Sequence, residues 1–174
     1  MFMWRSILLL LLIPFVSWQF LVSCEPDDVC TEVRLTPQMQ VKFVDNTNRT
    51  LPKIASDLQI NYITTSFDET LSVTNISVST DSLAVALPSF GNRAIYTFTQ
   101  YYNSENNIAN TDTIFVDYRL ESEYINRACG FRNTYKDVVV TTPPTSQATN
   151  WIKDIEVIFK EIEDEEQAHL VLYH

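Results

Sequence analysis

The sequence predicts an all-β protein: an antiparallel β-sandwich of immunoglobulin-like or related Greek-key type, preceded by a signal peptide. Short segments that alternate apolar and polar residues recur from residue 36 onward, and clusters of Asn, Asp, Ser and Pro separate them. No stretch between Thr36 and Thr142 shows the apolar period of an amphipathic helix. The chain has 174 residues, of which 45% are hydrophobic, so it can build one domain with a packed core.

The expected strands follow from this alternation. Met39, Val41 and Phe43 alternate with polar residues and predict the first strand. Further strands are expected over residues 58–62, 71–78, 83–87, 93–102 and 111–120, where β-branched and aromatic residues gather. Pro52 and Pro88 lie between strands, because proline cannot donate a ladder hydrogen bond in a central strand. In the last of these segments we expect one inward face, made of Ile114, Val116, Tyr118 and Leu120.

The segment from Trp151 to Ile162 fits two structures. Ile155, Val157 and Phe159 have the spacing of a strand, whereas Ile152, Ile155, Phe159 and Ile162 would share one face of a helix. The β-branched residues here and the apolar run at 168–173 favour a hairpin that turns at 163–166.

The first 23 residues have the features of an export signal. One positive charge, Arg5, precedes a short apolar run, and small residues close it. A membrane-spanning helix needs about 20 apolar residues, and this run is a little shorter and contains Pro14. We therefore expect a signal peptide at 1–23, a short tether and disulfide arm at 24–35, and a single β-sandwich domain at 36–174.

The end of this leader, Leu21-Val22-Ser23-Cys24, resembles the lipobox of bacterial lipoproteins. The resemblance implies that the thiol of Cys24 is joined to diacylglycerol, that the chain is cut before it, and that the new amino terminus is acylated. The alternative is an ordinary signal peptide whose cleavage site borders a cysteine.

The count of cysteines bears on this choice. An exported chain with three cysteines leaves one unpaired. If Cys24 carries lipid, Cys30 and Cys129 remain as an even pair in an oxidising compartment, and we expect them to form a disulfide. The lipid on Cys24 and the disulfide between Cys30 and Cys129 therefore support each other as predictions.

The net charge and the amino-acid composition exclude some classes of partner and cofactor. The net charge is −10, and removing residues 1–23 deletes Arg5 and no acid, which leaves −11. Such a surface repels phosphate backbones and anionic headgroups, so nucleic acid is not expected as a partner and membrane attachment needs a covalent anchor. Two glycines, Gly91 and Gly130, are too few for a phosphate-binding or dinucleotide-binding loop. No cofactor is expected.

The candidate catalytic and metal-binding groups each have a simpler explanation. His169 lies in an apolar segment and is expected to be a sheet-edge or satisfied core residue, and His174 is expected to be mobile. The acidic residues at 161–166 lack the ligand spacing of a calcium loop and suit a solvated turn. Asp117, Glu121 and Glu123 could be a glycosidase pair but more simply form a charged outer face. We expect neither catalysis nor a metal site.

Tyr96, Tyr101 and Tyr102 are the remaining candidates for a ligand platform. Tyrosine rings suit a partly wet surface on which a sugar could stack. Aromatic residues in sandwiches are more often core or cross-strand pairs, and both readings remain open here.

A wider resemblance rests on four short motifs: residues 24–30, Asn110-Thr111-Asp112-Thr113, Arg127-Ala128-Cys129-Gly130 and residues 168–173. Together they resemble a family of uncharacterised lipoproteins from Bacteroidetes, the domain of unknown function 6452. The resemblance implies an envelope location and no known activity. We therefore expect a non-enzymatic lipoprotein of the cell envelope, held at the outer membrane on its periplasmic or surface leaflet. It would act as a structural or protein-interaction module or, alternatively, bind carbohydrate or peptide, with an unidentified envelope protein or glycan as partner.

Overall fold

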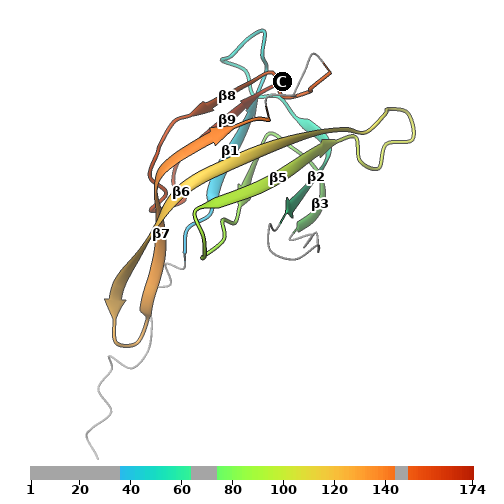
Figure 1. Ribbon diagram of the computed structural model, residues 1–174. Helices are drawn as coiled ribbons and strands as arrows, with labels where there is room; N and C mark the ends of the chain where they lie inside the picture. The colour runs from blue at the N-terminus through green and yellow to red at the C-terminus, as the bar shows by residue number, and fades with distance from the viewer. Residues whose placement is uncertain (1–35, 64–73, 144–148) are drawn as a thin grey trace, which may run out of the picture. The chain divides into compact units, whose positions relative to one another are not determined.

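The computed structural model describes residues 36–63, 74–143 and 149–174, and within them the fold is an all-β sandwich without helices (Figure 1). The strands are β1 (Met39–Val44), β2 (Ala55–Ile63), β3 (Thr74–Thr80), β4 (Ser82–Val85), β5 (Arg93–Gln100), β6 (Asn110–Asn126), β7 (Gly130–Thr141), β8 (Asp154–Val157) and β9 (Leu170–Tyr173). This confirms the predicted all-β sandwich. The predicted leader and tether lie outside the described residues.

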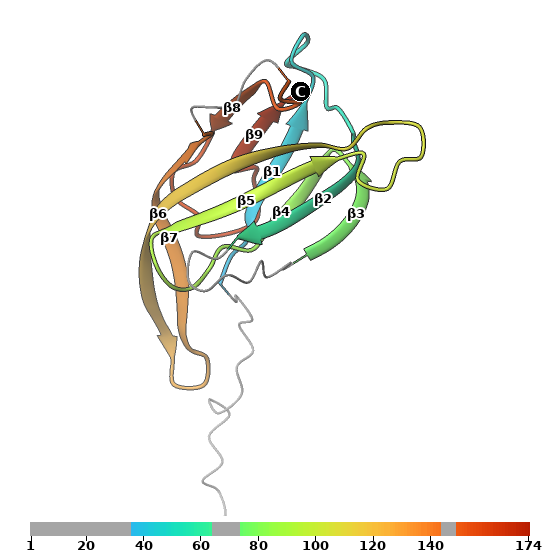
Figure 2. The same cartoon turned by 45° about the vertical axis from the view of Figure 1, so that its right-hand side comes forward.

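The strands form two sheets, which Figure 2 shows face to face. One has the order β4-β1-β9-β8 and the other the order β3-β2-β5-β6-β7. Their facing side chains make one core, in which Phe43 and Leu172 of the first sheet meet Phe98 and Val116 of the second. Burial of such side chains is the main stabilising contribution in a sandwich of this size.

The central strands β5 and β6 follow the predicted alternation. Ala94, Tyr96 and Phe98 of β5 are buried, and so are Ile114 and Val116 in the antiparallel β6. A strand with one buried face needs this period of two, because successive side chains point to opposite faces.

One strand pair departs from the predicted antiparallel pattern. β9 pairs parallel with β1, from Val41↔Leu170 to Val44↔Tyr173, and antiparallel with β8. The prediction of a purely antiparallel sandwich was therefore wrong at this pair. The apolar period of a strand reports which face is buried and carries no information about strand direction.

The segment from Trp151 to Ile162, which fitted both a strand and a helix, contains the short strand β8 (Asp154–Val157) and no helix. β8 and β9 form an antiparallel hairpin with Asp154 opposite Tyr173 and Val157 opposite Leu170. The connection between them, residues 158–169, includes the acidic turn at 163–166.

His174 is packed against the core, in contrast to the expectation that it would be mobile. Its ring contacts the rings of Phe43 and Trp151, with centroids 6.1 and 5.3 Å apart, and its backbone N–H donates to the carbonyl of Val44. These contacts extend the parallel pairing of β1 and β9 by one residue.

The chain divides into two compact units. The larger spans Arg34–Glu123 and Arg132–His174 and holds the two-sheet core. The described part of the smaller unit is Tyr124–Phe131, which contains the turn between β6 and β7.

Candidate functional site

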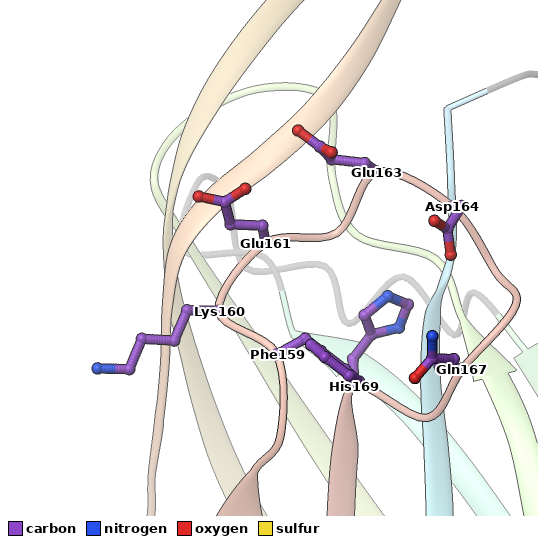
Figure 3. A pocket seen from close by; sticks show the side chains of 7 residues that line it. All are labelled: Phe159, Lys160, Glu161, Glu163, Asp164, Gln167 and His169. Atoms are coloured by element: carbon purple, nitrogen blue, oxygen red, sulfur yellow. The ribbon is translucent and has the colours of Figure 1, made fainter.

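The connection between β8 and β9 folds around an open hollow of about 310 Å³ in the larger unit. Its lining residues are Phe159, Lys160, Glu161, Glu163, Asp164, Gln167 and His169 (Figure 3). A hollow of this volume is at the lower end of the range of small-ligand sites.

Backbone hydrogen bonds to β7 hold one side of the hollow. The N–H of Ile162 donates to the carbonyl of Tyr135 at 2.8 Å, and the N–H of Tyr135 donates back to Ile162 at 3.1 Å. The N–H of Val138 donates to the carbonyl of Lys160. Ile162 is fully buried, so its side chain anchors the connection in the core. This wall of the hollow is therefore held in place by strand β7.

Lys136 of β7 fixes two acidic residues of this wall. Its ammonium pairs with Glu161 at 2.8 Å and also with Glu163, while its own side chain is only 14% exposed. The hydrogen bonds that its ammonium donates to both carboxylates raise the pKa of Lys136 to about 12. The two carboxylates are thus held in place, and one of their two negative charges is compensated.

His169 lies at the base of the hollow, tied to β1. Its Nδ1 accepts a hydrogen bond from the N–H of Gln40 at 3.0 Å, and its own N–H donates to the carbonyl of Gln40. Burial lowers the pKa of His169, against the opposing charges of Asp164 and Glu165. At neutral pH the ring is therefore uncharged, with its proton on Nε2. The expectation of a satisfied core histidine is confirmed.

The remaining side chains give the hollow a mixed character. Phe159 is 41% exposed and offers an apolar surface, and Gln167 offers an amide. In Figure 3 the side chain of Lys160 points away from the imidazole of His169, whereas Asp164 and Gln167 lie on the opposite side of that ring. Among these described lining residues there is no Ser, Thr or Cys that the histidine could activate as a nucleophile. The arrangement suits binding.

The three tyrosines considered as a platform do not form one surface. Tyr96 is 3% exposed, and its hydroxyl donates to the carbonyl of Ala86 inside the core. Burial raises the pKa of that hydroxyl. Tyr101 is half-buried with a φ of 59°, and Tyr102 is 48% exposed. Only Tyr102 of the three presents much of its ring to solvent, and Tyr96 belongs to the core, which was one of the two interpretations that the sequence left open.

Three acidic residues of β6, Asp117, Glu121 and Glu123, form an ion-paired outer face. Asp117 pairs with Arg93 at 2.5 Å, Glu123 pairs with Arg132 at 2.7 Å, and Glu121 pairs with Arg119. Each carboxylate has its own cationic neighbour on the exposed side of the sheet. This agrees with the charged outer face that the sequence predicted.

Of the three cysteines, only Cys129 lies within the described residues. It sits in the turn between β6 and β7, where its N–H donates to the side-chain oxygen of Asn126 at 2.7 Å. On either side of this turn the rings of Tyr124 and Phe131 are in contact, with centroids 5.2 Å apart. Cys24 and Cys30 lie outside the described residues.

Two general features concern metals and membranes. In residues 36–63, 74–143 and 149–174, no three His, Cys, Asp or Glu side chains are grouped so that they could hold a metal ion. The same residues contain no helix with the length and apolarity to cross a bilayer.

Comparison with protein families gives one match. A model described as a family of unknown function (DUF6452) covers residues 58–174, which is more than half of the chain. The chain belongs to this family. No curated protein and no solved structure matches it significantly.

The DUF6452 match includes both surfaces described above. The connection that forms the hollow and the turn that holds Cys129 lie within residues 58–174, whereas Cys24, Cys30 and β1 precede the matched region.

Neither the hollow nor the Tyr124–Phe131 pair was predicted from the sequence. The acidic residues at 161–166 indicated only a solvated turn, and the sequence gives no sign that Lys136 would meet them. For the aromatic pair, a signal existed: two aromatic residues flank Asn126 and Gly130, both common turn residues.

Proposed function

We propose that this chain is a non-enzymatic lipoprotein of the cell envelope, anchored to the outer membrane through Cys24, which works as a protein-interaction module. The observation that carries the interaction role is the hollow in the connection between β8 and β9, whose wall is fixed by paired backbone hydrogen bonds to β7 and by Lys136. A surface that is ordered before it binds loses less entropy on binding.

The anchoring part of the proposal rests on the sequence. The lipobox-like Leu21-Val22-Ser23-Cys24 closes an apolar leader. Cys129 is not a free thiol, which supports its pairing with Cys30 and leaves Cys24 for the lipid.

Carbohydrate or peptide binding is the second candidate function. The exposed ring of Phe159, together with the amide of Gln167 and the nearby carboxylates, combines an apolar face with hydrogen-bonding groups. This hollow suits a sugar or a peptide side chain better than Tyr102 alone would.

The anchor is tested by replacing Cys24 with Ala and fractionating cells that express the full chain. We expect the wild-type protein in the membrane fraction and the variant outside it. A Cys24→Ala protein that stays in the membrane fraction would show that the lipid anchor is wrong.

The binding role is tested with a photo-crosslinking residue at Gln167, in the hollow, and at Glu121, on the ion-paired outer face of β6. We expect a discrete crosslinked species in intact envelopes from position 167 and none from position 121. If both positions give the same pattern, the hollow is not the binding surface. Retention on envelope glycans that falls in Phe159→Ala but not in Tyr102→Ala would favour the carbohydrate alternative.

A further inference from the structure

The turn between β6 and β7 presents two large aromatic side chains to solvent. Tyr124 is 53% exposed and Phe131 is 70% exposed, although their rings contact each other edge to face. Mutual contact leaves most of each ring uncovered. Exposed apolar groups that gather in one place usually mark an interaction surface.

The turn itself has a defined conformation. Asn126 accepts the N–H of Cys129, and Gly130 has a φ of 71°, a left-handed conformation that glycine adopts without strain. Arg127 is exposed in the same turn. The two rings and the cation therefore belong to one small structural unit.

The short segment between Cys24 and Cys30 limits how far this aromatic surface can lie from the membrane. This step rests on the proposed function, in which Cys24 carries lipid and Cys30 is bonded to Cys129. Six peptide steps from Cys24 to Cys30 span at most about 20 Å. The bridge adds about 6 Å between the Cα atoms of its two cysteines, so Cys129 would be held within about 26 Å of the bilayer surface. The rings of Tyr124 and Phe131 lie on the two sides of its turn.

We infer that this aromatic turn (Tyr124, Arg127 and Phe131) is a bilayer contact, with the rings of Tyr124 and Phe131 in the headgroup region. Aromatic side chains favour the membrane–water boundary, since the ring is apolar and the hydroxyl of Tyr can remain hydrated. Arg127 can extend to a lipid phosphate while its methylene groups lie along apolar surface. The net charge of −11 that remains after removal of residues 1–23 gives no general attraction to anionic lipid, so the contact depends on the rings.

The contact is tested with mature lipidated protein in phosphatidylcholine vesicles whose acyl chains are brominated, because bromine quenches tryptophan fluorescence at short range. Phe131→Trp places the reporter in the aromatic turn. Ile108→Trp is the matched control, since Ile108 is 92% exposed in the loop between β5 and β6. Trp151 is buried and gives a constant background in both variants.

We expect Phe131→Trp to lose most of its added fluorescence in brominated vesicles and Ile108→Trp to keep its own. Phe131→Trp protein that floats with the vesicles but is not quenched would overturn the bilayer contact and leave the anchor intact. Equal quenching of both variants would also overturn it, because any exposed apolar residue would then adsorb. If the protein does not float with the vesicles, the lipid anchor fails and this inference fails with it.

Discussion

At the residue scale, Asp112 shows how one polar side chain can organise a core. It is 3% exposed and faces inward with Ile114 and Val116, and its carboxylate accepts the N–H of Ile152 at 2.7 Å. Burial raises the pKa of Asp112, against the hydrogen bonds that favour its charged form. The carboxylate therefore orients the chain just before β8.

We expect Asp112→Ala to lower the free energy of unfolding by about 1–3 kcal/mol, because the buried N–H of Ile152 loses its acceptor. Asp112→Asn should be milder, since the amide oxygen can accept the same hydrogen bond. Asp117→Ala removes an exposed ion pair and should change the stability by about 0–1 kcal/mol. Urea titration of the three variants measures these differences, and equal effects of Asp112→Ala and Asp117→Ala would contradict this role.

The two histidines make stability depend on pH. Burial lowers the pKa of both His169 and His174 below the ordinary value of 6.5. Below pH 6.5 the unfolded chain binds more protons than the folded chain, so their stabilising contribution is complete above that pH and declines as the pH falls.

We therefore expect the urea midpoint to decrease when the pH is lowered from about 7.5 to about 5. The decrease should be smaller in His174→Phe, because the phenylalanine ring can keep the contacts with Phe43 and Trp151. An unchanged pH dependence in this variant would show that His174 does not contribute.

At the element scale, a strand can be predicted from the sequence where buried and exposed residues alternate regularly along it. β5 and β6 alternate along most of their common length and were predicted from their sequence. β7 was missed, because Thr134 and Tyr135 are both buried in succession and Asp137 has a φ of 55°. An irregular strand of this kind loses the period of two by which it could be recognised.

β7 also lies at the end of its sheet, and the connection between β8 and β9 covers part of this edge. The pairing of Tyr135 with Ile162 uses edge groups that another chain could otherwise bind. The same contact shapes the hollow. Sequence reasoning could not find the site because it depends on an edge contact between segments far apart in the chain.

We expect Lys136→Met to loosen this connection, because it leaves Glu161 and Glu163 without their shared cation. Hydrogen exchange at the amide of Ile162 should become about tenfold faster, which corresponds to about 1.4 kcal/mol of local stability. Arg119→Met is the control, since Arg119 pairs with Glu121 and Asp137 on an exposed face. If both variants exchange equally at Ile162, Lys136 does not hold the loop.

At the scale of the whole molecule, the sandwich could be predicted and the arrangement of its strands could not. The spacing of apolar residues and the positions of turn residues indicate where the strands lie and which of their faces are buried. They do not indicate that the last strand of the chain lies between β1 and β8, because that order depends on contacts between distant residues.

The proposed Cys30–Cys129 bridge also belongs to this scale. It would close a loop of nearly a hundred residues, and on the chain-entropy model it would stabilise the fold by up to about 4–5 kcal/mol. We expect a non-reducing digest of the mature protein to contain one peptide in which Cys30 and Cys129 are linked, and Cys129→Ser to unfold at a lower urea concentration. Two alkylated free thiols at these positions would refute the bridge.

The parallel pairing of β1 with β9 has a consequence for the order of folding. Gln40 and His169 are 129 residues apart in the chain and yet hydrogen-bonded to each other. Until β9 arrives, β1 lacks one of its two neighbours and β8 lacks its partner. Contacts between such distant segments form slowly. A chain that is made from its amino terminus would therefore hold β1 with an exposed strand edge until Leu170–Tyr173 became available to pair with it.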